Sequence, residues 1–216
     1  MHRCLFFCAD LGYHFLFNEG FPSWLYCINL GATTIWERWN TVLEDGTISK
    51  MGMNSLNHHS YGTIVQFMYE YIGGIKPAEP GFKVANIAPV PSMRFRYFNS
   101  AITTAAGKYV SNWKIAEDGK LTVELEVPFN GAANVALPRF SRERLNITGG
   151  NVDITDDGKA TLPAGHYEIS YMPAQDFRNI YSPQTRLAEL PYLFYLGGTP
   201  ETVLPVTEQI IALKRW

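Results

Sequence analysis

One carboxylate in an aromatic setting is the residue of this sequence whose surroundings most favour chemistry. Glu37 lies between Trp36 and Trp39, and Arg38 follows it directly. Aromatic neighbours partly desolvate a carboxylate, which makes it a better proton acceptor near neutral pH. The same residue types also fit a surface ion pair between Glu37 and Arg38 beside two core tryptophans. Residue type and spacing alone therefore leave both a general base and a structural role open for Glu37.

A second polar cluster contains Asn57, His58 and His59, with Tyr61 close behind. Adjacent histidines point in different directions on a helix, so they cannot bind one metal ion together as an i, i+4 pair can. We therefore expect neither a metal site nor a cofactor. At the start of a helix, Asn57, His58 and Tyr61 could hydrogen-bond a polar ligand, but a helix cap with a solvated histidine explains them as well.

A long helix should follow this second cluster. Apolar residues recur at helical spacing, and they are Ile64, Met68, Tyr71, Ile72 and Ile75. Gly73-Gly74 and Pro77 supply a stop signal. We therefore predict one amphipathic helix over residues 56–75.

A shorter helix and a long loop should carry the Glu37 segment. Pro22 suits the first turn of a helix and Gly31 suits its C-terminal cap, which predicts a helix over residues 22–30. Residues 32–55 have no clear period and are predicted to form a loop. Long loops inside compact domains are usually functional, which adds weight to the chemistry of Glu37.

The hydrophobic period changes to two after Pro80-Gly81. One predicted strand contains Met93, Phe95 and Tyr97, alternating with arginines, and another contains Leu121, Val123, Leu125 and Val127. Turn signals such as Asn130-Gly131 separate such runs. We predict an antiparallel β-sandwich over about residues 81–173, with the four aliphatic residues of the second strand facing inward. Weak helical patterns return at 187–196 and 203–213.

Composition narrows the possible partners. The chain has 18 basic and 20 acidic residues, and no run of Lys or Arg, so nucleic acid and anionic membranes are not expected partners. No segment has the length of apolar sequence that a membrane helix needs. The cysteines Cys4, Cys8 and Cys27 are odd in number and lack metal-site spacing, which indicates reduced structural thiols. We expect a cytoplasmic protein.

Longer motifs resemble family 78 of the glycoside hydrolases, the bacterial α-L-rhamnosidases. The motifs that carry the resemblance are Asn18 to Tyr26, Gly31 to Asn40, Gly52 to His58, Tyr61-Gly62, Gly74-Ile75, Pro80 to Lys83, Ile87 to Pro89 and Gly107 to Tyr109. Several ordered motifs of this length rarely match by chance. The resemblance covers nearly the whole chain.

The resemblance implies an α+β multidomain fold, in which C-terminal helices of an (α/α)6 toroid precede an antiparallel β-sandwich. Residues 1–76 would form the last part of the catalytic toroid, residues 77–173 the sandwich, and residues 174–216 a partly helical tail. The implied activity is hydrolysis of terminal, non-reducing α-L-rhamnose with inversion of configuration. The implied ligand is a rhamnosylated glycoside or polysaccharide.

The resemblance also assigns roles to the two polar clusters. It makes Glu37 the general base and aligns His58 with a rhamnose-binding histidine, while Trp36 and Asn57 are expected to contribute to substrate binding. Arg38 and Trp39 are expected to support the loop, Arg38 through a charge-assisted hydrogen bond.

This sequence departs from the family pattern in one important respect. An inverting glycosidase needs a second carboxyl group as general acid, and nothing here matches the acidic motif that carries it in the family. Two hypotheses follow. In the first, this chain belongs to a rhamnosidase, and the N-terminal part of that enzyme, which lies outside this chain, is the partner of this chain. In the second, the chain is a non-catalytic remnant with a carbohydrate-associated β-sandwich.

Overall fold

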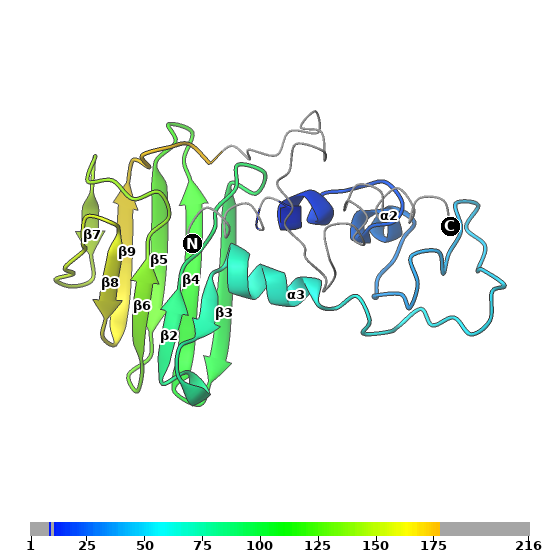
Figure 1. Cartoon of the computed structure of the whole chain (residues 1–216), viewed down its shortest axis with the longest axis horizontal. Helices are drawn as coiled ribbons and strands as arrows, with labels where there is room; N and C mark the ends of the chain where they lie inside the picture. Colours follow the sequence, from blue (N-terminus) through cyan, green and yellow to red (C-terminus); the bar gives the residue numbers. More distant parts are fainter. Residues whose placement is uncertain (1–8, 10, 178–216) are drawn as a thin grey trace, which may run out of the picture.

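The computed structural model describes residue 9 and residues 11–177, and it shows a helical, loop-rich part beside a β-sandwich (Figure 1). The predicted tail helices at 187–196 and 203–213 lie outside the described residues. No helix within 11–177 is both long enough and apolar enough to cross a membrane.

The first part contains only short helices. Residues 11–16 are helical, and α2 (Trp24–Asn29) follows. The Ser23 hydroxyl caps α2 by accepting a hydrogen bond from the Tyr26 amide at 3.0 Å. Gly31 has a φ of 89°, the left-handed conformation that favours glycine after a helix end. The predicted helix over 22–30 is confirmed as this shorter element.

The helix predicted over 56–75 is wrong in its first part. The helix begins with α3 (Ile64–Phe67) and continues as one turn of π-helix, η1 (Met68–Ile72). Residues 55–60 form a loop, because the Ser55 and His58 side chains bond the local backbone and compete with helix formation. The predicted stop at Gly73-Gly74 is confirmed, since Gly73 caps the π-helix.

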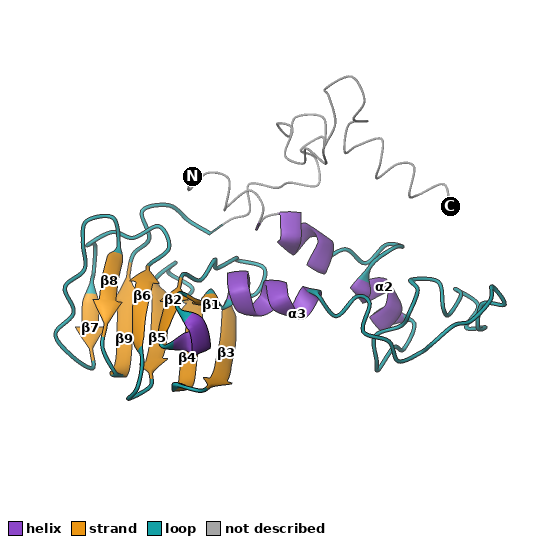
Figure 2. Ribbon diagram, turned by 60° about the horizontal axis from the view of Figure 1, so that its bottom comes forward, coloured by secondary structure: helices purple, strands orange, loops and turns teal. Residues whose placement is uncertain are grey.

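Two sheets form the β-sandwich (Figure 2). The five-stranded sheet has the order β3 (Tyr97–Thr104), β4 (Gly107–Ile115), β5 (Leu121–Val127), β9 (Gly165–Tyr171) and β7 (Asn146–Thr148). The four-stranded sheet has the order β1 (Ile75–Pro77), β2 (Val84–Ile87), β6 (Ala132–Ala136) and β8 (Lys159–Leu162). A 3-10 helix, η2 (Pro80–Phe82), links β1 to β2.

The fold class is confirmed, with two local differences. The sheet that contains β2 and β6 is mixed, because these two strands pair in parallel while all other pairs are antiparallel. Three strands of the other sheet, β3 to β5, intervene between them and carry the chain back to the same end. Residues 93–96 form a turn rather than the predicted strand, and Arg96 has a left-handed φ of 60°, so β3 begins only at Tyr97.

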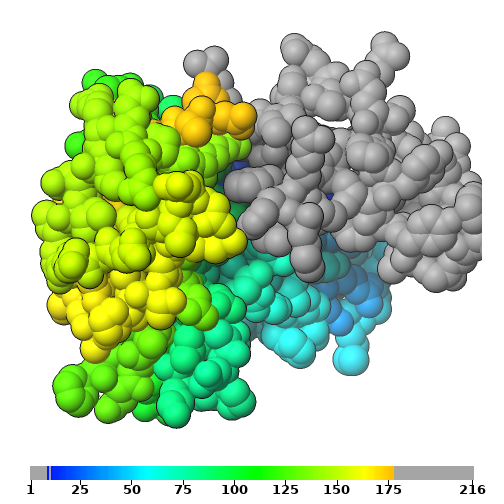
Figure 3. All heavy atoms as spheres, turned by 60° about the vertical axis from the view of Figure 1, so that its left-hand side comes forward, coloured from blue at the N-terminus to red at the C-terminus, as the bar shows by residue number. Residues whose placement is uncertain are grey.

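The core lies between the two sheets. Leu121, Val123, Leu125 and Val127 of β5 are all buried, as predicted, and Glu124 on the opposite face is exposed. Aromatic residues of the neighbouring strands fill the same core, and they are Tyr109, Trp113, Tyr167 and Tyr171. Tyr13, Leu16 and Ile72 from the helical part join this cluster, so the two parts share one hydrophobic core. The space-filling view shows the sandwich surface continuing into that of the neighbouring segment around residues 50–75 (Figure 3).

Candidate active site

Two loop segments pair beside α2 and bring the two polar clusters together. The Glu37 amide donates to the Ser55 carbonyl at 2.9 Å, and the His58 amide donates to the Ile35 carbonyl at 2.7 Å. The Thr34 hydroxyl also donates to the Leu56 carbonyl. The predicted loop over 32–55 is therefore ordered by backbone contacts with the residues that follow it.

The Glu37 side chain is half-buried and held by one backbone group. Its Oε2 accepts a hydrogen bond from the Ser55 amide at 2.9 Å. Glu37 and Ser55 thus bond each other twice, once through the backbone and once through the carboxylate. Within 11–177, Oε1 accepts no hydrogen bond and Glu37 forms no ion pair with Arg38. This arrangement fixes the carboxylate while leaving one oxygen available to a water molecule.

His58 is connected to Glu37 through Ser60. The Ser60 amide donates to Nδ1 of His58 at 3.1 Å, and the Ser60 hydroxyl donates to the Glu37 carbonyl at 3.3 Å. Because Nδ1 accepts from an amide, a neutral His58 ring carries its hydrogen on Nε2. The ring stacks on His59 with a centroid distance of 4.9 Å. His58 can therefore offer an N–H donor to a hydroxyl group.

Arg38 anchors the loop to a more distant turn. Its Nη1 donates to the Met51 carbonyl at 2.8 Å, and its amide donates to the Thr41 hydroxyl at 3.2 Å. Thr41 is fully buried, and its hydroxyl also reaches Oδ1 of Asn54 at 3.4 Å. Asn54 in turn donates to the Ser49 carbonyl at 2.9 Å. These bonds hold residues 38–54 in one conformation.

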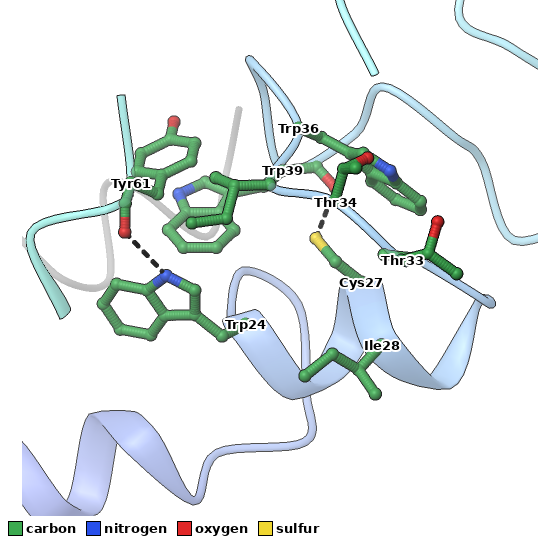
Figure 4. Close-up of a pocket in the computed structure, with 10 residues that line it drawn as sticks. Trp24, Cys27, Ile28, Thr33, Thr34, Trp36, Trp39 and Tyr61 are labelled. Atoms are coloured by element: carbon green, nitrogen blue, oxygen red, sulfur yellow. Dashed lines mark hydrogen bonds between the residues drawn. The ribbon is translucent and has the colours of Figure 1, made fainter. Parts of the chain in front are cut away.

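An aromatic cluster of Trp24, Trp39 and Tyr61 lies beside α2 (Figure 4). Trp39 stacks on Tyr61 with a centroid distance of 3.8 Å and meets Trp24 edge-on at 5.2 Å. The Trp24 indole donates to the Tyr61 carbonyl at 3.0 Å, and the Cys27 thiol contacts the Trp39 carbonyl at 3.7 Å. The cluster fastens both polar segments to α2.

The aromatic cluster borders a cavity of roughly 250 Å³. Its lining includes Trp36, which is only 5% exposed, together with Thr33 and Thr34. Burial raises the pKa of the Cys27 thiol and that of the Tyr61 hydroxyl, as expected for an apolar environment. Cys27 is free and buried, as predicted, whereas Cys4 and Cys8 lie outside the described residues.

The predicted site residues thus fall into two groups. Glu37 and His58 lie together on the paired loops, and Asn57 beside them is exposed, with its amide side chain unbonded within the described residues. Trp36 and Trp39 line the aromatic cavity, to which Glu37 does not contribute. Sequence reasoning missed the roles of Ser55, Ser60 and Trp24, which no local period signals.

Two other acidic side chains of the helical part, Asp45 and Glu70, have structural partners. Asp45 accepts bonds from the hydroxyl and the amide of Thr47, which hold the pKa of this carboxyl below its usual range. Glu70 accepts from Gln66 at 2.7 Å and pairs with Lys76 at 3.8 Å. Glu19, Glu44 and Asp45 are exposed, and Glu70 bonds only to side chains. Within residues 11–72, Glu37 is therefore the carboxylate that is both half-buried and held by a backbone amide.

Comparison with known proteins assigns both parts of the chain. Residues 8–72 match the bacterial alpha-L-rhamnosidase 6 hairpin glycosidase domain, and residues 74–151 match the bacterial alpha-L-rhamnosidase C-terminal domain. The chain is 43% identical to an alpha-L-rhamnosidase of Formosa agariphila over 142 residues, which cover 66% of the chain and 15% of that enzyme. It is 47% identical to an alpha-L-rhamnosidase of Alteromonas over 131 residues, which cover 60% of the chain and 14% of that enzyme.

Solved structures give the same result. The Streptomyces avermitilis alpha-L-rhamnosidase complexed with L-rhamnose has a TM-score of 0.66 and 31% identity, covering 74% of the chain and 16% of that protein. The Aspergillus terreus enzyme has a TM-score of 0.63 and 30% identity, covering 74% of the chain and 17% of that protein. The chain thus spans less than a fifth of the length of these relatives. It belongs to the bacterial α-L-rhamnosidase family, in which it corresponds to the end of the six-hairpin glycosidase domain and the C-terminal domain.

Proposed function

We propose that this chain supplies the general base of an inverting α-L-rhamnosidase, with Glu37 in that role. The observation that carries the proposal is the Glu37 carboxylate itself, which is half-buried and fixed by the Ser55 amide through Oε2, with Oε1 unbonded within the described residues. A general base must be held in place and still reach a water molecule. The complex of the Streptomyces relative with L-rhamnose makes a rhamnoside the first substrate to test.

The neighbouring residues divide the remaining work. The Nε2–H of His58 and the exposed amide of Asn57 would bind sugar hydroxyls, because both are donors beside Glu37. Arg38 and Trp39 support the loop through the Met51 carbonyl and the stack on Tyr61. Trp36 would act from the aromatic cavity, either on a sugar face or on the loop that carries Glu37.

The second carboxyl of the reaction would come from outside the described residues. Inverting hydrolysis uses an acid and a base roughly 6.5 to 9.5 Å apart, with water between the base and the sugar. Asp45 and Glu70 are engaged with Thr47 and Lys76, so neither replaces the acid. We therefore place the general acid on the earlier hairpins of the glycosidase domain, and these hairpins would be the partner of this chain. Separately, we propose a cytoplasmic setting.

The proposal can be tested in a chimera with the Alteromonas relative, which is 47% identical over the matched segment. The aligned segment of that enzyme is exchanged for this chain, and release of nitrophenol from nitrophenyl α-L-rhamnoside is measured. Glu37→Gln keeps the size of the side chain but removes the base, so kcat should fall at least about a hundredfold. His58→Ala should mainly raise KM, because its proposed role is to bind hydroxyls.

Two controls accompany the chimera. Glu44→Gln changes an exposed carboxylate of the same loop and should leave turnover unchanged. The 216-residue chain alone should release no nitrophenol above background, because it lacks the acid. A Glu37→Gln chimera with near-normal turnover would rule out the assignment, and substantial activity of the chain alone would remove the need for a separate acid.

A further inference from the structure

Four consecutive carbonyl groups at the end of the π-helix accept hydrogen bonds from the β-sandwich. The Tyr71 carbonyl accepts from the Val90 amide at 2.9 Å, and the Gly74 carbonyl accepts from the Ala88 amide at 3.0 Å. Between them, the Ile72 carbonyl accepts from the Trp113 indole at 2.8 Å and the Gly73 carbonyl accepts from the Ser111 hydroxyl at 2.6 Å. The last carbonyls of a helix have no partner within the helix. Here the sandwich provides the partners.

The two glycines permit this close approach. A Cβ on Gly73 would lie 2.3 Å from the Ser100 hydroxyl oxygen. Gly74 has a φ of 76°, and a Cβ there would lie 2.2 Å from the backbone of Ala88. Neither contact is possible for a real Cβ, so larger residues would push the helix end away from the strands. The sequence Gly73-Gly74 therefore does more than stop the helix, because it lets the carbonyls reach β4.

The helix leads directly from this anchored end to the candidate site. Its first residues follow Tyr61 and Gly62, and the Tyr61 ring stacks on Trp39 of the Glu37 loop. A second connection runs through Phe67, whose ring meets that of Tyr13 edge-on at 5.8 Å. The Tyr13 hydroxyl donates to the Val90 carbonyl of the sandwich at 2.6 Å. The helix is thus joined to the Glu37 loop through Tyr61, and a second time to the sandwich through Phe67 and Tyr13.

We propose that Trp113 and Ser111 of β4 are positioning residues, which cap the helix of residues 64–72 and thereby hold the His58 segment against the Glu37 loop. The sandwich would act as a brace for the site, in addition to any contact of its own with a ligand. The proposal goes beyond the proposed function and stands even if Glu37 is not catalytic, because it concerns the order of the site loops. Only its consequence for hydrolysis rests on the proposed function.

Hydrogen exchange of the 216-residue chain tests the brace without any activity assay. Trp113→Phe removes the indole donor and keeps an aromatic ring, and Ser111→Ala removes one hydroxyl. In either variant, amides in peptides covering residues 55–73 should exchange roughly tenfold faster, as expected when one buried hydrogen bond to a helix end is lost. Those amides include the one of Ser55 that holds the Glu37 carboxylate.

Tyr109→Phe is the matched control. Tyr109 lies on the same strand, is fully buried, and donates to the Phe82 carbonyl at 2.8 Å. This bond lies within the sandwich. Its loss can therefore change hydrogen exchange in peptides of the sandwich, but exchange in residues 55–73 should stay at the wild-type rate. Wild-type exchange of residues 55–73 in Ser111→Ala, whose small change should preserve folding, would overturn the proposal. Equal acceleration in Tyr109→Phe would do so too, because it would show general destabilisation.

Discussion

The two parts of this molecule keep their shape by different means. The sandwich buries alternate residues of long paired strands, and β5 shows the pattern with four buried aliphatic side chains. The site loops between Gly31 and Thr63 contain no helix, and they are held by separate contacts, such as the hydrogen bond from Arg38 to the Met51 carbonyl and the stack of Trp39 on Tyr61. Burial of apolar side chains in a core therefore stabilises the sandwich, whereas separate contacts between individual residues stabilise the site loops.

The two parts also differ in how many large apolar side chains they expose. Among the described residues, most large apolar side chains that are exposed belong to the helical part, namely Phe15, Phe21, Ile28, Leu43, Ile48, Met51, Met53, Leu56, Val65 and Tyr69. Exposed apolar patches commonly mark surfaces that contact another protein segment. The helical part therefore leaves more apolar surface uncovered than the sandwich does, although Tyr13, Leu16 and Ile72 bury theirs in the shared core.

The largest effect is expected from a charge in the sandwich core. Val123 is fully buried, so Val123→Asp places an unpaired carboxylate between the sheets and should cost more than about 4 kcal/mol of unfolding free energy. Glu124→Ala, at the next position but on the exposed face, should change stability by less than about 0.5 kcal/mol. Urea unfolding followed by far-UV circular dichroism measures both. Similar losses in the two variants would mean that the inward face of β5 is misassigned.

A smaller and local effect is expected in the site loop. Thr41→Val removes the hydroxyl that joins the Arg38 amide to Asn54, and it should cost roughly 1 to 2 kcal/mol of local stability. Hydrogen exchange in residues 38–54 should accelerate about tenfold while the sandwich strands are unaffected. Thr33→Val, an exposed threonine of the same loop, is the control. Acceleration throughout the chain would contradict the view that single contacts hold this loop separately from the core.

Alkaline pH should weaken the sandwich through Tyr171. Burial raises the pKa of this hydroxyl far above its ordinary value of 10.0, and it donates to the Pro138 carbonyl at 2.7 Å. Above pH 10 the unfolded chain loses this proton while the folded chain keeps it, so the folded state binds more protons and stability falls as pH rises. The loss is about 1.4 kcal/mol per pH unit above 10.

Tyr171→Phe separates this effect from general alkaline damage. The variant should be less stable than wild type at pH 8, because a buried hydrogen bond is lost, but its stability should decline less steeply between pH 10 and 11.5. Tyr97→Phe, at an exposed position at the start of the edge strand β3, should leave the slope unchanged. Parallel slopes for wild type and Tyr171→Phe would exclude Tyr171 as the responsible group.

The smallest effect concerns access to the aromatic cavity and leaves stability unchanged. Cys27 is 7% exposed, and burial raises the pKa of its thiol, so iodoacetamide should label it at least about tenfold more slowly in the folded chain than in denaturant. Peptide mass spectrometry follows this cysteine separately from the other two. Equal rates would show that the cavity is open under native conditions, and that the site region is looser than its contacts indicate.

The sequence by itself determined the features that depend on local period and motif. The alternation from Leu121 to Val127 identified the inward face of β5, and Gly73-Gly74 identified the end of the helix. Ordered motifs identified the family, and the matches over residues 8–72 and 74–151 bear this out. These features are legible because each depends on neighbours along the chain.

Only the tertiary structure decided how the site is built. Residues 55–60 have the polarity of a helix start, yet they pair with the Glu37 loop, and the Ser55 bond to Glu37 joins residues 18 positions apart. The bond from Trp113 to the Ile72 carbonyl spans 41 positions. Local period carries no record of such partners, because a long-range hydrogen bond forms only after the core has placed both groups. For the same reason, the parallel pairing of β2 with β6 could not be predicted from the sequence, because it depends on where the chain returns after β5.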